Sequence, residues 1–74
     1  MTSEKLKNLA KIVDNAKISS LSTRKNRKHF ALYIAKEVGL WEPNVISFVE
    51  EMAGLNFYSH EDRKIFMQFA EEAL

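Results

Sequence analysis

The chain has 74 residues, of which 46% are hydrophobic and eight are aromatic; it has no cysteine and a net charge of +1. This composition indicates one small domain with enough apolar residues for a core, and it excludes disulfides and thiolate metal sites. No apolar run approaches the roughly 20 residues that cross a bilayer, and the N-terminus lacks the apolar region of a signal peptide. We therefore expect a single domain over residues 1–74, soluble and cytoplasmic.

The charges are distributed unevenly along the chain. Residues 1–36 contain nine Lys or Arg and two Asp or Glu, whereas residues 37–74 contain two basic and eight acidic residues. The first half therefore carries +7 and the second half −6. Such asymmetry indicates an interaction surface, and the alternative is that the two halves attract one another inside the fold.

The first predicted helix covers about residues 3–17. Thr2 and Ser3 are good N-cap residues, and the apolar positions that follow are spaced as on one face of an amphipathic helix. These positions are Leu6, Leu9, Ala10, Val13 and Ala16. Residues 18–23 then contain four Ser or Thr, which favour turns, so we expect a short connection with Ser22 or Thr23 as the next N-cap.

The second predicted helix, over residues 24–38, begins with the densest group of positive charges in the chain. Arg24, Lys25, Arg27 and Lys28 lie in its first turn and a half, where the helix dipole disfavours each cation by roughly a few tenths of a kcal/mol. This misfit suggests a role in binding phosphate, nucleic acid or an acidic protein surface. The alternative is a solvated basic turn that the acidic half of the chain neutralises.

The remaining helices are predicted at 43–53 and 60–73, which gives a compact all-α bundle of four short helices. Gly39 and Gly54 end the second and third helices, Pro43 begins the third, and Ser59 with Asp62 resembles a capping box before the fourth. The expected buried residues are Phe30, Ala31, Tyr33, Ile34, Ala35 and Val38 in the second helix, Val45, Phe48, Val49 and Met52 in the third, and Ile65, Phe66, Met67, Phe69, Ala70 and Ala73 in the fourth.

The spacing of Ala35, Gly39 and Val45 resembles the helix-turn-helix of small DNA-binding regulators. A recognition helix over residues 43–52 would, however, present mainly Asn44, Ser47 and two glutamates, with no Lys or Arg to bind guanine. We therefore expect this central hairpin to be a helix-turn-helix-like packing unit. A DNA-binding regulator that uses the basic cluster is the competing hypothesis.

Aromatic residues also occur outside the predicted helices. Trp41 lies in the turn before the third helix, where it is either a lid over the core, the commoner arrangement for tryptophan, or an exposed anchor for a partner. Phe57 and Tyr58 precede the fourth helix, and we expect them to close one end of the core; the alternative is that these adjacent aromatics form part of a groove.

The chain lacks the residue patterns of catalysis and of metal or cofactor binding. His29 and His60 are the two histidines, and they are not spaced as a zinc pair. His60 stands beside Glu61 and Asp62, but the beginning of a helix explains this acidic group better than a metal does. Both glycines lie at predicted helix ends, so no glycine-rich phosphate loop is present. We expect neither an enzyme nor a cofactor.

The stretch from Ile18 to Ala35, with the small size and the Lys-, Glu- and Asn-rich composition, resembles the small accessory proteins of T-even-type phages. The resemblance is to the cytoplasmic lysis-inhibition proteins, or antiholins, and it implies that the partner is the cytoplasmic part of a holin. It carries no functional residues over to this chain.

We therefore expect a regulatory protein that binds another protein with an acidic surface, through Arg24, Lys25, Arg27, Lys28 and Trp41. Nucleic acid is the alternative partner, and homodimerisation is left open.

Overall fold

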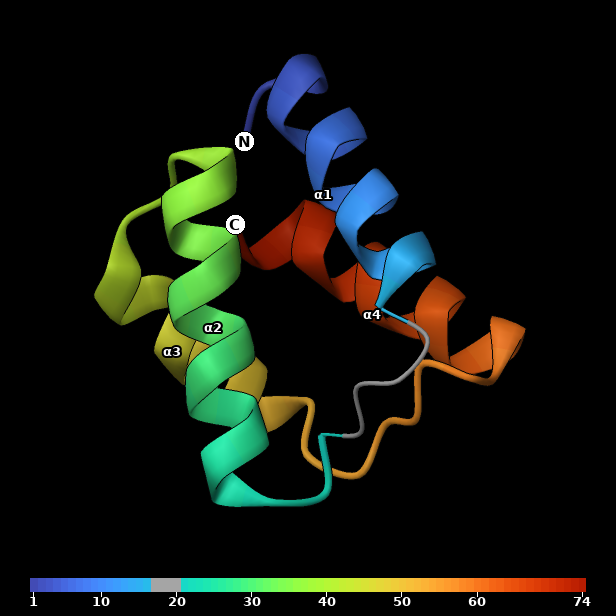
Figure 1. Cartoon of the computed structure of the whole chain (residues 1–74). Helices are drawn as coiled ribbons and strands as arrows, with labels where there is room; N and C mark the ends of the chain where they lie inside the picture. The colour runs from blue at the N-terminus through green and yellow to red at the C-terminus, as the bar shows by residue number, and fades with distance from the viewer. Residues whose placement is uncertain (17–20) are drawn as a thin grey trace.

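Four helices make up the computed structural model, which describes residues 1–16 and 21–74 (Figure 1). They are α1 (Ser3–Asn15), α2 (Arg24–Val38), α3 (Glu42–Glu51) and α4 (His60–Ala73), so the predicted all-α bundle of four short helices is confirmed. The third helix begins one residue earlier and ends two residues earlier than predicted. The first helix was predicted to run to Lys17, but it ends at Asn15 and Ala16 is its C-cap. Lys17 and residues 18–20 of the predicted connection lie outside the described residues.

Side-chain hydroxyl groups cap three of the helices, because the first backbone N–H groups of a helix have no partner within it. The hydroxyl oxygens accept hydrogen bonds from N–H groups three residues further on, in the pairs Thr2 with Lys5, Thr23 with Asn26, and Ser59 with Asp62. Of the two residues proposed to cap α2, it is therefore Thr23 that does so.

The Ser59–Asp62 pair differs from a complete capping box. The Asp62 carboxylate accepts a hydrogen bond from the backbone N–H of Asn56 at 2.9 Å, whereas a capping box would direct it to the N–H of Ser59. The shorter side chain of Asp, compared with Glu, accompanies this change of partner. Asp62 thereby fixes the loop before α4 as well as the start of the helix.

The helix α3 packs against α2 and crosses behind it in Figure 1, and α1 packs against both α2 and α4. Gly39 ends α2 with a φ of 82°, a left-handed conformation that glycine adopts without steric cost. The Nζ of Lys5 donates a hydrogen bond to the Gly39 carbonyl at 2.6 Å, which joins α1 to the turn between α2 and α3.

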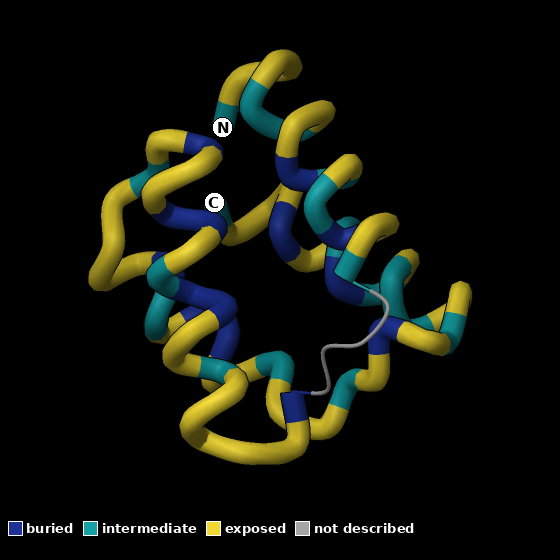
Figure 2. Tube along the Cα trace, in the orientation of Figure 1, coloured by how far each residue is buried: buried dark blue, intermediate teal, exposed yellow. Residues whose placement is uncertain are grey.

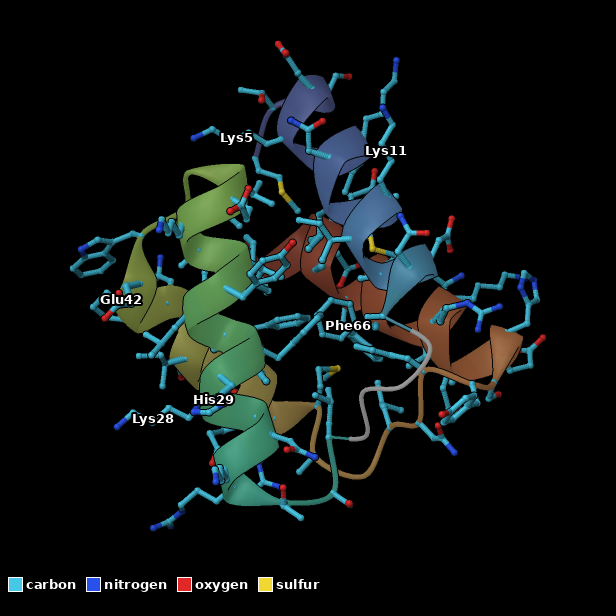
Figure 3. The ribbon with its side chains drawn as sticks, in the orientation of Figure 1. Lys5, Lys11, Lys28, His29, Glu42 and Phe66 are labelled. Atoms are coloured by element: carbon cyan, nitrogen blue, oxygen red, sulfur yellow. The ribbon has the colours of Figure 1, made fainter. Side chains whose placement is uncertain are left out.

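Four phenylalanines form the centre of the core. The ring of Phe66 lies 5.1 Å from Phe48, 5.2 Å from Phe57 and 5.9 Å from Phe30, with all three pairs in edge-to-face contact. Phe66 therefore joins α4 to α2, to α3 and to the loop before α4 (Figure 3). The buried parts of the chain face this centre, and in the described part of the chain every buried residue is apolar (Figure 2).

The sequence interpretation missed one core residue in the connection between α1 and α2. Leu21 is completely buried. Its backbone N–H donates to the Leu55 carbonyl at 3.1 Å, and its carbonyl accepts from Gly54 at 3.4 Å. These bonds hold the connection against the segment between α3 and α4.

Three aromatic residues expected to be buried are exposed instead. Tyr33 is 53% exposed, Phe69 50% and Tyr58 64%, whereas Phe57 next to Tyr58 is completely buried. Tyr33 on α2 and Phe69 on α4 therefore lie at the surface and do not belong to the core. Ala73, at the end of α4, is also exposed, and Ile65 is half-buried.

Candidate functional site: the groove between α2 and α3

The residues of the predicted basic cluster come from the first two turns of α2. Arg24, Lys25 and Lys28 are exposed, whereas Arg27 is partly buried. The first turn of α2 contains no acidic residue, so the unfavourable placement of these cations at the positive end of the helix dipole is present in the structure. Lys28 points away from the core (Figure 3).

Arg27 is held by contacts within the protein. Its Nε donates to the Glu50 carboxylate of α3, and its Nη1 donates to the Leu21 carbonyl at 2.9 Å. The Arg27 side chain is only 16% exposed. This guanidinium therefore joins α2 to α3 and to the connection before α2, and it also neutralises Glu50.

Pairing between the two halves of the chain is limited in the described residues. The Arg27–Glu50 pair joins the basic cluster to the acidic half of the chain. The second ion pair, Arg63–Asp14 at 3.8 Å, takes its cation from the acidic half, so it does not neutralise the basic cluster. Within residues 1–16 and 21–74, the structure gives Arg24, Lys25 and Lys28 no carboxylate partner within ion-pair distance. Internal neutralisation thus accounts for one of the four cations in the cluster.

A hollow of about 250 Å³ lies between the basic cluster and α3. We call it the α2–α3 groove, and its lining residues are Arg24, Arg27, Lys28, Ile46 and Glu50. Ile46 is half-buried and supplies an apolar wall. Because Arg27 neutralises Glu50, the groove keeps the two exposed positive charges of Arg24 and Lys28. Such a site can bind a carboxylate next to an apolar side chain.

Trp41 is 70% exposed, so its placement as a lid over the core is wrong. It is the N-cap residue of α3 and makes no side-chain capping hydrogen bond. Trp41 lies in the short turn that begins at Gly39 and connects α2 to α3. Trp41 is therefore exposed, as the alternative hypothesis expected, and its role as an anchor for a partner stays a prediction.

Trp41 and the basic cluster lie at opposite ends of the α2–α3 pair. The Arg27–Glu50 contact marks one end and Trp41 the other, and the ten residues of α3 between them span about 15 Å. Lys28 and Glu42, the residue after Trp41, project on the same side of the molecule (Figure 3). The two parts of the predicted contact surface are therefore separate but share one side.

The other exposed side of α3 faces the end of α4. Asn44, Ser47 and Glu51 line a second hollow, of about 220 Å³, together with Phe48 and Ala73. These are the outward positions of the hypothetical recognition helix, and α3 contains three glutamates and no Lys or Arg. The likeness of α2 and α3 to a helix-turn-helix remains a prediction.

The two histidines, His29 and His60, are both exposed and belong to different helices. Across residues 1–16 and 21–74, no three His, Asp or Glu side chains are grouped so that they could hold a metal ion. A search of these same residues finds no helix with the length and apolar character needed to cross a membrane.

Comparisons of the chain with models of protein families, with curated proteins and with solved structures found no match. The functional proposal therefore depends on the geometry of the groove and on the sequence.

Proposed function

We propose that the protein is a non-enzymatic regulatory protein that binds an acidic segment of another protein in the α2–α3 groove. The observation that carries this proposal is the pair of exposed cations, Arg24 and Lys28, beside the apolar side chain of Ile46. Among the described lining residues the carboxylate is Glu50, which is already paired with Arg27 and does not repel an acidic ligand strongly.

The two parts of the groove have different physical roles in this proposal. Exposed charges act mainly on the rate and selectivity of association, since water and salt screen them, and each exposed pair contributes only about 0–1 kcal/mol. The apolar contact on Ile46 adds about 25 cal/mol for each Å² of apolar surface removed from water. The preferred ligand is therefore a segment with both acidic and apolar residues.

The resemblance to phage lysis-inhibition proteins extends the proposal to a particular partner. We propose that this partner is the cytoplasmic part of a holin, bound through an acidic and apolar stretch. The basis for this extension is the sequence resemblance, while the groove supports only the chemical class of the ligand.

Nucleic acid is the competing partner for the same cations. The composition of α3 disfavours this hypothesis, because the helix contains three glutamates, which repel phosphates, and no Lys or Arg to contact bases. Binding of DNA through Arg24, Lys25 and Lys28 alone would be independent of sequence and steeply dependent on salt.

The test compares two variants with the same change of net charge. Arg24→Glu with Lys28→Glu reverses the groove, whereas Lys11→Glu with Lys64→Glu reverses two exposed lysines on α1 and α4. Fluorescence anisotropy measures binding of a labelled peptide of repeated Glu-Glu-Leu-Leu, of the matching Lys-Lys-Leu-Leu peptide and of a random DNA duplex. A purified cytoplasmic segment of a T-even-type holin is the fourth probe.

We expect the acidic peptide to bind the native chain, and the groove variant to bind it about tenfold or more weakly. The control variant should lose less than about threefold, since only long-range charge has changed. Equal losses in the two variants would show that net charge alone attracts the peptide, which contradicts the proposal. Binding of the DNA duplex in preference to the peptide would replace it with the nucleic-acid hypothesis.

A further inference from the structure

We propose that the same side of the α2–α3 pair also binds a second copy of the chain, in a two-fold symmetric dimer. In this dimer the basic end of each α2–α3 pair meets the Trp41 end of the other. This inference rests on the proposed function, because both proposals treat the α2–α3 groove as a binding surface.

The two ends of the pair have complementary chemistry. At one end Arg24, Lys25 and Lys28 present exposed cations. At the other end the indole of Trp41 is 70% exposed and the carboxylate of Glu42 is exposed beside it. Cations bind favourably to the face of an indole and to a carboxylate, and Trp and Arg are among the residues most enriched where protein interfaces are strongest.

The other charges near Trp41 do not cancel this attraction. Lys36 and Glu37, at the end of α2, are exposed and carry opposite charges. The Nζ of Lys5 donates to the Gly39 carbonyl, so this ammonium is already engaged by the end of α2. The groups at this end that can attract a cation from another molecule are therefore the indole of Trp41 and the carboxylate of Glu42.

Two-fold symmetry follows from the positions of these groups. Because the basic cluster and Trp41 lie at opposite ends of one surface, a rotation axis perpendicular to α3 and near its middle places each end against the opposite end of the partner. Both sets of contacts then form at once, and the assembly closes without extending into a filament. Ile46 lies near the middle of α3 and lines the groove, so the two copies of Ile46 meet close to the axis.

Dimer formation and binding of an acidic partner would exclude each other. Arg24 and Lys28 line the groove and also form the basic end that meets Trp41 in the dimer. The dimer would thus hold the protein with its binding groove covered, and a partner segment at sufficient concentration would shift the population to the bound monomer.

The absence of cysteine from the chain permits a direct test by disulfide cross-linking. Ile46→Cys places a single thiol next to the proposed axis, and Gln68→Cys places one on the exposed side of α4 as the control. Under mild oxidation we expect the Ile46→Cys protein to form disulfide-linked dimers at least roughly tenfold faster than the control. Adding Trp41→Ala to Ile46→Cys should remove most of this difference.

Sedimentation velocity of the unmodified chain, over a roughly 100-fold range of concentration, provides a measurement that does not depend on the folding of a variant. The proposal predicts a shift from monomer to dimer with increasing concentration, and weaker association in high salt. A monomer at every concentration, or equal cross-linking of the two cysteine variants, would overturn it.

Different experimental results would contradict the dimer and the binding of an acidic segment. If the chain stays monomeric but binds the Glu-Glu-Leu-Leu peptide, the dimer is wrong and the proposed function stands. If the chain dimerises through Ile46 and Trp41 but its monomer binds no acidic probe at low concentration, the dimer stands and the proposed function is wrong.

Discussion

Arg27 shows how one side chain in the basic cluster differs in role from its neighbours. Its guanidinium contacts Glu50 on α3 and the carbonyl of Leu21, whose side chain is completely buried. Arg24 and Lys28 line the same groove but are exposed and have no described carboxylate partner. The cluster therefore divides into one cation that stabilises the fold and others that are available for binding.

This division predicts unequal effects on stability. Arg27→Ala should lower the free energy of unfolding by about 1–3 kcal/mol, because the Leu21 carbonyl and Glu50 lose a charged hydrogen-bond partner. Lys25→Ala, which changes an exposed residue in the same turn region, should change the free energy of unfolding by less than about 0.5 kcal/mol. Urea denaturation of the two variants measures the difference. Equal effects would mean that the contacts of Arg27 do not stabilise the fold.

Among the helices, α4 stabilises the fold mainly through the face that carries Phe66. Phe66 contacts Phe30, Phe48 and Phe57, whereas Phe69, one turn further along, is half exposed. We expect Phe66→Ala to lower the free energy of unfolding by about 3–5 kcal/mol, which is large enough to unfold a domain of this size. Phe69→Ala, the matched control, should cost less than about 1.5 kcal/mol.

Thermal unfolding followed by circular dichroism compares these two variants. We expect a much lower melting temperature, or no folded state, for Phe66→Ala, and a small decrease in melting temperature for Phe69→Ala. A larger effect of Phe69→Ala would contradict the assignment of the core.

The helices themselves were predictable from local patterns. Thr2, Thr23 and Ser59 supply the caps, and Gly39 has the left-handed conformation that its place after α2 suggested. What the patterns did not determine is which apolar positions another element covers. Tyr33 and Phe69 fit the helical period as well as Phe30 and Phe66 do, but their exposure depends on how the helices pack.

The candidate site was predictable only in part, for a similar reason. The charge cluster at Arg24–Lys28 is visible in the sequence, because it opposes the helix dipole. The partner of Arg27 is not visible, since Glu50 lies 23 residues away and comes close only when α3 packs against α2. Ile46 lies outside the predicted buried stripe of α3, but the sequence does not show that α2 brings the basic cluster next to it.

At the scale of the whole molecule, the opposite charges of the two halves do not cancel inside the fold. Among the described residues one ion pair joins the basic cluster to the acidic half, and the remaining cations of the cluster stay exposed at one end of the α2–α3 pair. The molecule therefore presents separate charged surfaces, and the groove combines one of these surfaces with an apolar wall. This combination is the basis of both proposals.

An NMR titration of the isotope-labelled chain with the Glu-Glu-Leu-Leu peptide identifies the residues that bind an acidic segment. If the groove binds acidic segments, the largest changes in backbone amide shifts should cluster at residues 24–28 and 46–50, and the Arg24→Glu, Lys28→Glu variant should show much smaller changes at the same peptide concentration. Shift changes that are spread over every exposed lysine and arginine, or that are centred on another helix, would contradict the assignment of the groove as the binding site.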